Sequence, residues 1–377
     1  MSYFISLTTK HLVPVGGVSF VILVLFLHVE TSKTPFLAGL RSVDWSGALL
    51  IIGGTIMFLF GLEFGGVSHP WDSPTVICLI IFGVFVWALA MLNEWKVAKY
   101  PIIPVRLFKN RHNVVMLLIC FCHGFVFIAT SYYLPLYFQS VLLSTPILSG
   151  VYVLPIVISL SLVSICVGVI MRKTGRYREP IIFGMIFMAL GVGLFIDLKS
   201  YASWSRIIVY QIIAGIGVGP NFQAPLVAFQ ANILPSDTAT ATATFGFVRQ
   251  LSTSISVVLG SVIYQNILGQ QMPRITEAIG PEKASKLAGS FAGADKAVIR
   301  SLSESQKRVV LDAFTYALSR MWIFYTAFVG LGLLLSLLVR PIELSKVNFK
   351  GTIGLEEHER ARQKILDAEK NKTDPQP

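Results

Sequence analysis

An arginine lies inside a stretch of the chain that is otherwise apolar. Arg249 stands about eight residues inside a predicted membrane span, about 12 Å below the cytoplasmic surface at 1.5 Å rise per residue. A charge near the centre of a membrane costs about 2.5 to 3.5 kcal/mol, so we expect this side chain to face the protein interior or an aqueous cavity. The alternative is snorkelling to the interface. The partners considered for Arg249 are a ligand anion, a backbone carbonyl and a further helix.

Amides and phenols in other apolar stretches could bind an organic ligand. Apolar surface supplies affinity in such sites, while a few hydrogen bonds orient the bound molecule. Interhelical hydrogen bonding without a ligand is the alternative interpretation. The candidate cavity residues are Tyr132, Tyr133, Gln211, Asn221, Gln223, Arg249 and Gln250. His123 is interpreted as a packing or hydrogen-bonding residue, with proton transfer as the alternative.

Motifs for catalysis and metal binding are absent from the sequence. It has no HExxH or GxSxG motif, no paired intramembrane carboxylates and no metal-spaced histidines or cysteines. The four cysteines fall in apolar spans and are interpreted as packing residues. We therefore predict no catalytic residue, no metal, no cofactor and no enzymatic activity.

The composition predicts a polytopic membrane protein. Hydrophobic residues make up 54% of the chain and charged residues only 14%. The net charge of +11 is spread over short loops and the tail, which favours membrane topology over nucleic-acid binding. The apolar runs are long and continuous, so the predicted fold is all-α with about nine transmembrane helices. These are predicted at residues 12–28, 46–64, 75–94, 113–138, 147–171, 180–197, 206–229, 241–268 and 321–339.

Lysines and arginines in the short loops predict the orientation. They gather after the third and fifth predicted spans and in the tail, which places the C-terminus in the cytoplasm and the N-terminus outside. Tryptophans are expected at span ends, at Trp45, Trp71, Trp95, Trp204 and Trp322. Between the last two spans, residues 275–320 predict a short surface helix with a capping box at Ser303 and Gln306, or a solvated spacer.

A basic hairpin joins the fifth and sixth predicted spans. Gly175 supplies the positive φ that a very short turn needs, and the cations suit a helix C-terminus at the cytoplasmic face. The residues of this loop are Gly168, Arg172, Gly175, Arg176 and Arg178.

The seventh predicted span contains Gly217, Gly219 and Pro220. Glycine has no side chain and proline has no N–H, so these residues weaken the helix locally and permit a bend. Neighbouring helices must then donate hydrogen bonds to the carbonyls that lose their helical partners. The span is therefore a candidate moving part. Close approach of two helices without movement is the alternative.

These motifs resemble those of a known transporter family. The hairpin resembles the signature loop of the major facilitator superfamily, with Arg172 where the family's stronger copy has an aspartate. The segments 215–225 and 237–250 resemble the fourteen-span drug:proton antiporters of that superfamily, especially fungal exporters of drugs and toxins. The resemblance covers about residues 14–340.

The resemblance implies a major facilitator fold that lacks its first five helices. Residues 1–45 would then be a remnant of the N-terminal half with one transmembrane helix. Residues 46–112 would hold two inserted linker helices and a cytoplasmic loop. Residues 113–340 would form the complete C-terminal six-helix bundle, with an outer loop at 269–320, and residues 341–377 a cytoplasmic tail.

The expected function is proton-coupled export of a hydrophobic drug, toxin or secondary metabolite. The expected partners are the lipid bilayer, a small organic substrate, protons and a polypeptide that supplies the missing half. We expect this chain to be truncated and inactive alone, in the plasma membrane or alternatively the vacuolar membrane. The alternative is a membrane interaction subunit or a defective product.

Overall fold

The computed structural model describes residues 14, 16–22, 24–25, 43–66, 68–98, 103–233, 237–287 and 296–340. The chain divides into two compact units, residues 1–42 with 350–377 and residues 43–349. In the first unit, the described residues are helical and fall within the predicted span 12–28. The rest of that span, and the predicted tail 341–377, lie outside the described residues.

Eight helical segments of the described residues are long and apolar enough to cross a membrane, which confirms the all-α fold class. They correspond to the second to ninth predicted spans. They are α3 (Trp45–Phe64), α4 (Pro74–Lys96), α5 (Arg111–Ser140), α6 with α7 (Pro146–Tyr152, Leu154–Thr174), α8 with the 3-10 turn η2 (Arg178–Leu194, Phe195–Asp197), α9 with η3 and α10 (Trp204–Val218, Pro220–Phe222, Ala224–Gln230), α11 (Thr238–Ile279) and α14 (Glu304–Leu337).

Local sequence signals explain several helix ends. The Asp44 side chain accepts a hydrogen bond from the Gly47 N–H at the start of α3, and Ser73 caps α4, which has a proline in its first turn. At the end of α7, Gly175 adopts φ 70°, which confirms the predicted left-handed turn.

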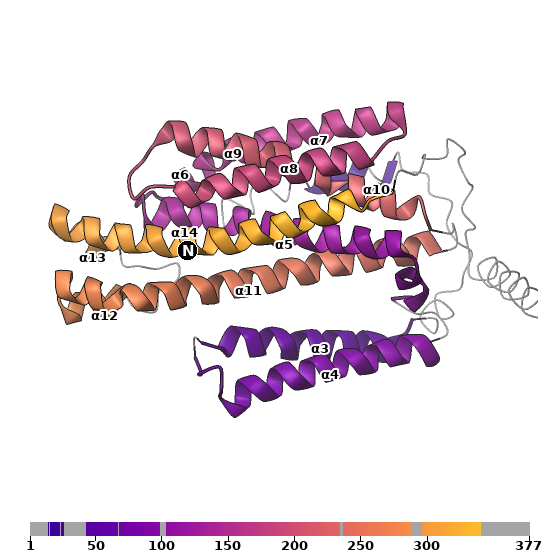
Figure 1. Cartoon of the computed structure of the whole chain (residues 1–377), viewed down its shortest axis with the longest axis horizontal. Coiled ribbons are helices and arrows are strands. Elements are labelled where there is room, and N and C mark those ends of the chain that lie inside the picture. Colours follow the sequence, from indigo (N-terminus) through magenta and orange to yellow (C-terminus); the bar gives the residue numbers. More distant parts are fainter. Residues whose placement is uncertain are drawn as a thin grey trace, which may run out of the picture. The chain divides into compact units, whose positions relative to one another are not determined.

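The helices α3 and α4 form a closely packed pair. An ideal Cβ on Gly83 would lie 2.7 Å from the backbone nitrogen of Phe58, so glycine is required where these helices meet. The pair packs mainly against itself. It contacts the rest of the structure chiefly where α3 meets α11, with a smaller contact between α4 and η1 (Figure 1). The short 3-10 helix η1 (Val105–Lys109) follows α4 and leads into α5.

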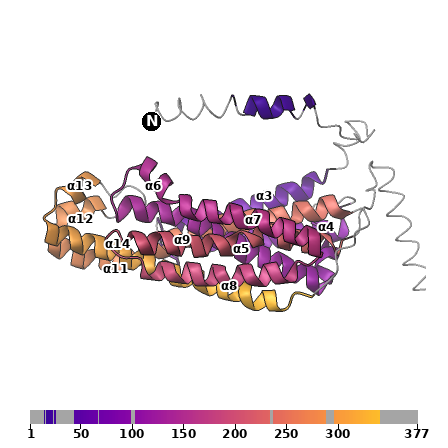
Figure 2. The ribbon, with the colours of Figure 1, turned by 90° about the horizontal axis from the view of Figure 1, so that it is seen from above.

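The remaining spans form one bundle around α5. This helix packs against α10, α11 and α14, and the long helices of the bundle run roughly parallel (Figure 2). Phe125, Tyr133 and Tyr325 are buried at the junction of α5, α11 and α14. Trp322 is buried and lies 5.1 Å from the ring of Phe195 in η2, so it packs inside the protein instead of being exposed at a membrane interface.

The last two spans are longer than predicted. The helix α11 continues to Ile279, and α14 begins at Glu304 with the predicted capping box of Ser303 and Gln306. The expected short surface helix is therefore continuous with the last span. Buried Ile275 and Val310 explain this extension, since both helices keep an apolar stripe beyond the membrane-length segment. The short helices α12 (Pro281–Leu287) and α13 (Lys296–Arg300) lie between them.

Candidate functional site at a broken helix

The span that contains the predicted bend is broken. The helix α9 ends at Val218, the turn η3 follows, and α10 resumes at Ala224. Pro220 begins η3 and has no N–H to continue the helical hydrogen-bond pattern. The span is thus interrupted at the position where the sequence predicts a bend.

The glycines beside the break allow neighbouring helices to approach. An ideal Cβ on Gly217 would collide with the backbone nitrogen of Met188 in α8, and one on Gly219 would lie 2.7 Å from the Leu160 carbonyl oxygen in α7. The glycines therefore permit close packing beside the break, and a bend of the span stays a prediction.

Side chains from neighbouring helices satisfy carbonyls at the break. His123 of α5 lies with its Nε2 3.2 Å from the Val218 oxygen, and Ser164 of α7 donates its hydroxyl to the Gly219 oxygen at 2.7 Å. His123 is buried, and its ring packs edge-to-face on Phe222 at 5.2 Å. This geometry supports a hydrogen-bonding role for the histidine.

Arg249 of α11 provides a further donor to the break. Its Nη2 donates to the Phe222 carbonyl oxygen at 2.9 Å. Its Cζ lies 5.7 Å from the Phe222 ring centroid and 5.2 Å from that of Phe245, within cation–π range. None of the ion pairs among the described residues includes Arg249. A backbone carbonyl, one of the partners considered from the sequence, is the partner that the structure provides.

Two buried amides lie along the same span. Asn221 donates to the Gly217 oxygen at 3.2 Å, and Gln211 donates to the Tyr152 oxygen at 2.9 Å and to the Ile207 oxygen at 3.1 Å. The side-chain oxygen of each amide has no hydrogen-bond partner within the described part of the chain. Each therefore retains an acceptor that a rearrangement of the bundle could use.

The two predicted tyrosines differ in exposure. Tyr133 is fully buried and donates to the Val257 oxygen at 2.7 Å, so it joins α5 to α11. Tyr132 is 44% exposed and packs edge-to-face on Tyr133. Gln223 and Gln250 are also exposed. The predicted cavity residues thus form a buried group that holds the helices together and an exposed group, Tyr132, Gln223 and Gln250, that is available for contacts.

The basic hairpin is anchored by a residue that the sequence did not single out. Arg172 and Arg176 are exposed, Arg178 is half-buried, and Gly168 has open space where a Cβ would stand. Tyr177 is buried and donates to the Arg340 oxygen at 3.0 Å, which ties the hairpin to the end of α14. An aromatic residue between two arginines in a short loop is the signal that could have indicated this anchor.

Ser164 was also missed by the sequence analysis. It is one of several serines in its span, and the others visible in the pattern, Ser159 and Ser161, bond to carbonyls of their own helix. No local feature distinguishes Ser164, because its partner belongs to a distant segment. Among the described residues, no group of three potential metal ligands is present.

Long apolar helices packed around a broken helix, whose carbonyls accept hydrogen bonds from its neighbours, define a polytopic helical membrane protein. Residues 12–257 match the profile of the Major Facilitator Superfamily. The chain belongs to this family of membrane transporters.

Curated relatives include fungal efflux pumps and transporters. The chain is 50% identical over 348 residues to the efflux pump dotC of Dothistroma septosporum (strain NZE10 / CBS 128990), which covers 92% of this chain and 60% of the pump. It is 46% identical over 361 residues to the MFS-type transporter ppz2 of Metarhizium majus, covering 96% of this chain and 62% of that transporter. The chain thus spans about 60% of the length of these relatives.

Proposed function

We propose that the chain forms the substrate-exporting C-terminal bundle and linker pair of a proton-coupled efflux transporter. The observation that carries this proposal is the break between α9 and α10, whose carbonyls accept hydrogen bonds from His123, Ser164 and Arg249 of three neighbouring helices. Such a helix can change its angle by exchanging hydrogen bonds rather than losing them. The names of the efflux-pump relatives support export as the direction.

The proposed substrate is a small hydrophobic drug, toxin or secondary metabolite. Tyr132, Gln223 and Gln250 offer exposed hydrogen-bonding groups on a bundle that is otherwise mainly apolar. An apolar organic molecule with a few polar groups suits such a surface. Protons are the proposed coupling ion. The proposed location is the plasma membrane, or alternatively the vacuolar membrane, with the C-terminus in the cytoplasm.

We propose that a polypeptide of these 377 residues alone does not transport. Alternating access requires one bundle to move against another around a midplane site. The described residues 103–340 form a single bundle, and α3 and α4 form a pair beside it. A second polypeptide or segment that supplies the facing bundle is the proposed partner.

Vesicle transport tests this proposal. One sample contains the chain alone, and another contains the chain with the part of the dotC pump that its alignment leaves unmatched. Efflux of a hydrophobic fluorescent dye is measured with and without an imposed proton gradient. We expect gradient-dependent efflux only from the combined sample. Efflux by the chain alone would contradict its inactivity, and no efflux from a correctly assembled pair would contradict the proposed function.

The alternative proposal is a membrane interaction subunit. It is favoured by the exposed polar residues on the bundle, which would then contact a stoichiometric partner rather than a substrate. Purification in mild detergent distinguishes the two proposals, because a subunit retains its partner without any effect of substrate or proton gradient.

A further inference from the structure

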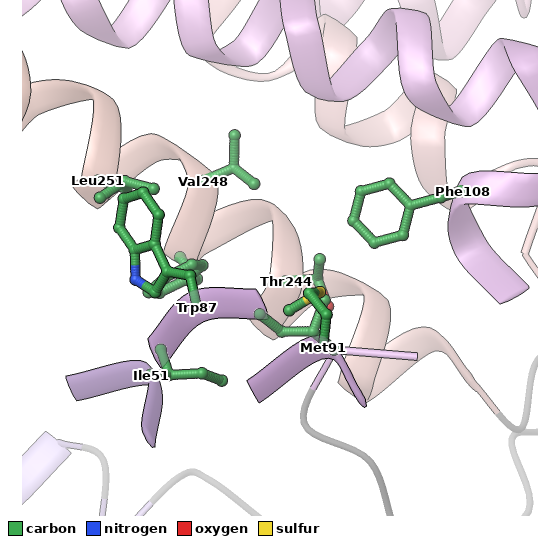
Figure 3. Close-up of a pocket in the computed structure, with 9 residues that line it drawn as sticks. Ile51, Trp87, Met91, Phe108, Thr244, Val248 and Leu251 are labelled. Carbon is green, nitrogen blue, oxygen red and sulfur yellow. The ribbon is translucent and has the colours of Figure 1, made fainter. Parts of the chain in front are cut away.

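An apolar cavity lies where α4, η1 and α11 meet. It has a volume of about 230 Å³ and is lined by Trp87, Phe108, Thr244 and Val248, among others. Figure 3 shows Trp87, Met91 and Phe108 around this space, with Thr244, Val248 and Leu251 on α11. A second, more open groove of about 570 Å³ shares Met91 and Phe108 with this cavity and extends to Trp95; it is called the outer cavity below.

The polar groups in the wall are directed elsewhere. The Trp87 indole donates to the Thr55 hydroxyl at 3.1 Å, and Thr244 donates to the Thr240 oxygen of its own helix at 2.9 Å. The remaining lining side chains are apolar. The cavity therefore offers no hydrogen bond to an occupant and suits a hydrocarbon chain.

Two contacts hold the cavity open by fixing η1 between its walls. Glu94 near the end of α4 accepts a hydrogen bond from the Ile103 N–H at 3.2 Å. Arg106 pairs with Asp237 at the start of α11 at 2.6 Å. These contacts anchor the segment that carries Phe108 to both helices, so the space is a built feature of the fold.

Three cations lie beside lining residues or within a few positions of them in the sequence. Lys96 lies beside the lining residue Trp95, with its Nζ 5.4 Å from the ring centroid, and Lys109 follows the lining residue Phe108. Arg111 begins α5 two residues later. All three cations are exposed, and none of the ion pairs among the described residues includes them.

The acidic groups nearby already accept hydrogen bonds. Asp44 accepts from Ser46, Gly47 and Asn93, and Glu94 accepts from the Ile103 N–H. Glu94 is buried and Asp44 half-buried, whereas the three cations are exposed, and Trp95 beside them is 67% exposed. An exposed tryptophan at a span end is typical of the headgroup level of a membrane.

We propose that this cavity binds an anionic phospholipid. One acyl chain occupies the space between α4 and α11, and the phosphate lies against Lys96, Lys109 and Arg111. The lining runs from Trp87 to Trp95, about 12 Å along α4, which compares with about 15 Å of hydrocarbon in one leaflet. The bound lipid joins the linker pair to the bundle. This inference does not depend on the proposed transport function.

Photocrosslinking tests the proposal on the full chain in lipid bilayers. Phosphatidylserine or phosphatidylcholine carrying a diazirine in one acyl chain is activated by light, and the labelled peptides are identified by mass spectrometry. We expect phosphatidylserine to label Met91, Phe108 and the 244–251 segment of α11 more than other lipid-facing helices. Phosphatidylcholine is expected to label this site at least about fivefold less, since each cation near an anionic group contributes about that factor.

Two pairs of variants test separately the role of the cations and the role of the apolar cavity. Lys96→Gln with Lys109→Gln should reduce phosphatidylserine labelling of the site about 30-fold. Arg172→Gln with Lys173→Gln, which removes the same charge from the last turn of α7, should leave that labelling unchanged. Ala88→Trp fills the outer cavity and should reduce labelling by both lipids, whereas Leu89→Trp on the next exposed position should not.

Several outcomes would overturn the proposal. Equal labelling by the two lipids over all exposed helices would identify ordinary boundary lipid. Equal effects of the two charge-removing pairs would exclude a site at η1. A co-purified polypeptide crosslinked to Phe108 in place of lipid would identify the cavity as a protein interface. The Leu89→Trp and Arg172→Gln/Lys173→Gln variants control for loss of folding.

Discussion

Arg249 illustrates how a single charge is accommodated inside a helical membrane bundle. Its guanidinium donates to the Phe222 oxygen and lies over the Phe222 and Phe245 rings. The carbonyl exists as an acceptor because the helix is broken at that point. The charge and the break therefore depend on each other, and neither is simply a defect in an apolar span.

Replacing Arg249 should weaken the bundle. Arg249→Ala removes the donor to Phe222 and both ring contacts, and we expect a loss of about 1–3 kcal/mol in the free energy of unfolding. Arg249→Lys should reduce the free energy of unfolding by less, because lysine retains the charge and a hydrogen-bond donor. It lacks the planar guanidinium that lies over the two rings. Unfolding of the purified chain in detergent measures this. Arg274→Ala, an exposed change on the same helix, is the control, and an equal effect there would contradict the assignment.

His123 should be replaceable by another donor. His123→Gln can still donate to the Val218 oxygen, whereas His123→Leu leaves that carbonyl without its partner. We expect the leucine variant to be less stable than the glutamine variant by about 0.5–1.5 kcal/mol. Thermal unfolding followed by size-exclusion chromatography compares them. Equal stability of the two variants would show that the hydrogen bond contributes nothing measurable.

At the scale of elements, the break between α9 and α10 organises the bundle. Gly217 brings α9 against α8, and Gly219 brings the same span against α7. Donors from α5, α7 and α11 converge on the carbonyls between them. One interrupted span thus contacts helices on several sides, which makes it the element through which movement of one helix would affect the others.

Glycine-to-alanine substitutions should distinguish the effect of close helix packing on stability from the effect of helix propensity. Gly217→Ala places a methyl group against the Met188 backbone, and we expect it to destabilise the chain by about 1–3 kcal/mol. Gly246→Ala lies in α11 with open space around it, so it should instead stabilise by up to about 1 kcal/mol. Denaturant unfolding gives both values. The same sign for both changes would contradict the packing argument.

The sequence predicted those features that local chemistry determines. Apolar run length predicted the spans, Gly175 predicted the left-handed turn, and Pro220 predicted the break. The partners at the break could not be predicted, because they are distant in the sequence. Ser164 is 55 positions from Gly219, and His123 is 95 positions from Val218, so each pair meets only in the folded bundle. The length of α11 could not be predicted for a related reason. Ile275 lies beyond the apolar run and is buried by tertiary packing.

At the scale of the whole molecule, the cations indicate an orientation. Arg106, Lys109 and the α7–α8 hairpin lie at helix ends that alternation of the spans assigns to one membrane face. The same alternation assigns α12, between α11 and α14, to the opposite face. Because short loops with many cations remain in the cytoplasm, the hairpin face is predicted to be cytoplasmic.

Cysteine labelling from one side of the membrane tests this orientation. Lys173 in the hairpin region and Lys283 in α12 are both exposed, so a cysteine at either position should react with a membrane-impermeant maleimide. In sealed right-side-out vesicles we expect labelling of Lys283→Cys, and of Lys173→Cys only after the membrane is opened. The unsubstituted chain, with its four native cysteines, gives the baseline. The reverse pattern would invert the topology and place the proposed lipid phosphate in the outer leaflet, where anionic lipids would no longer be the expected occupants.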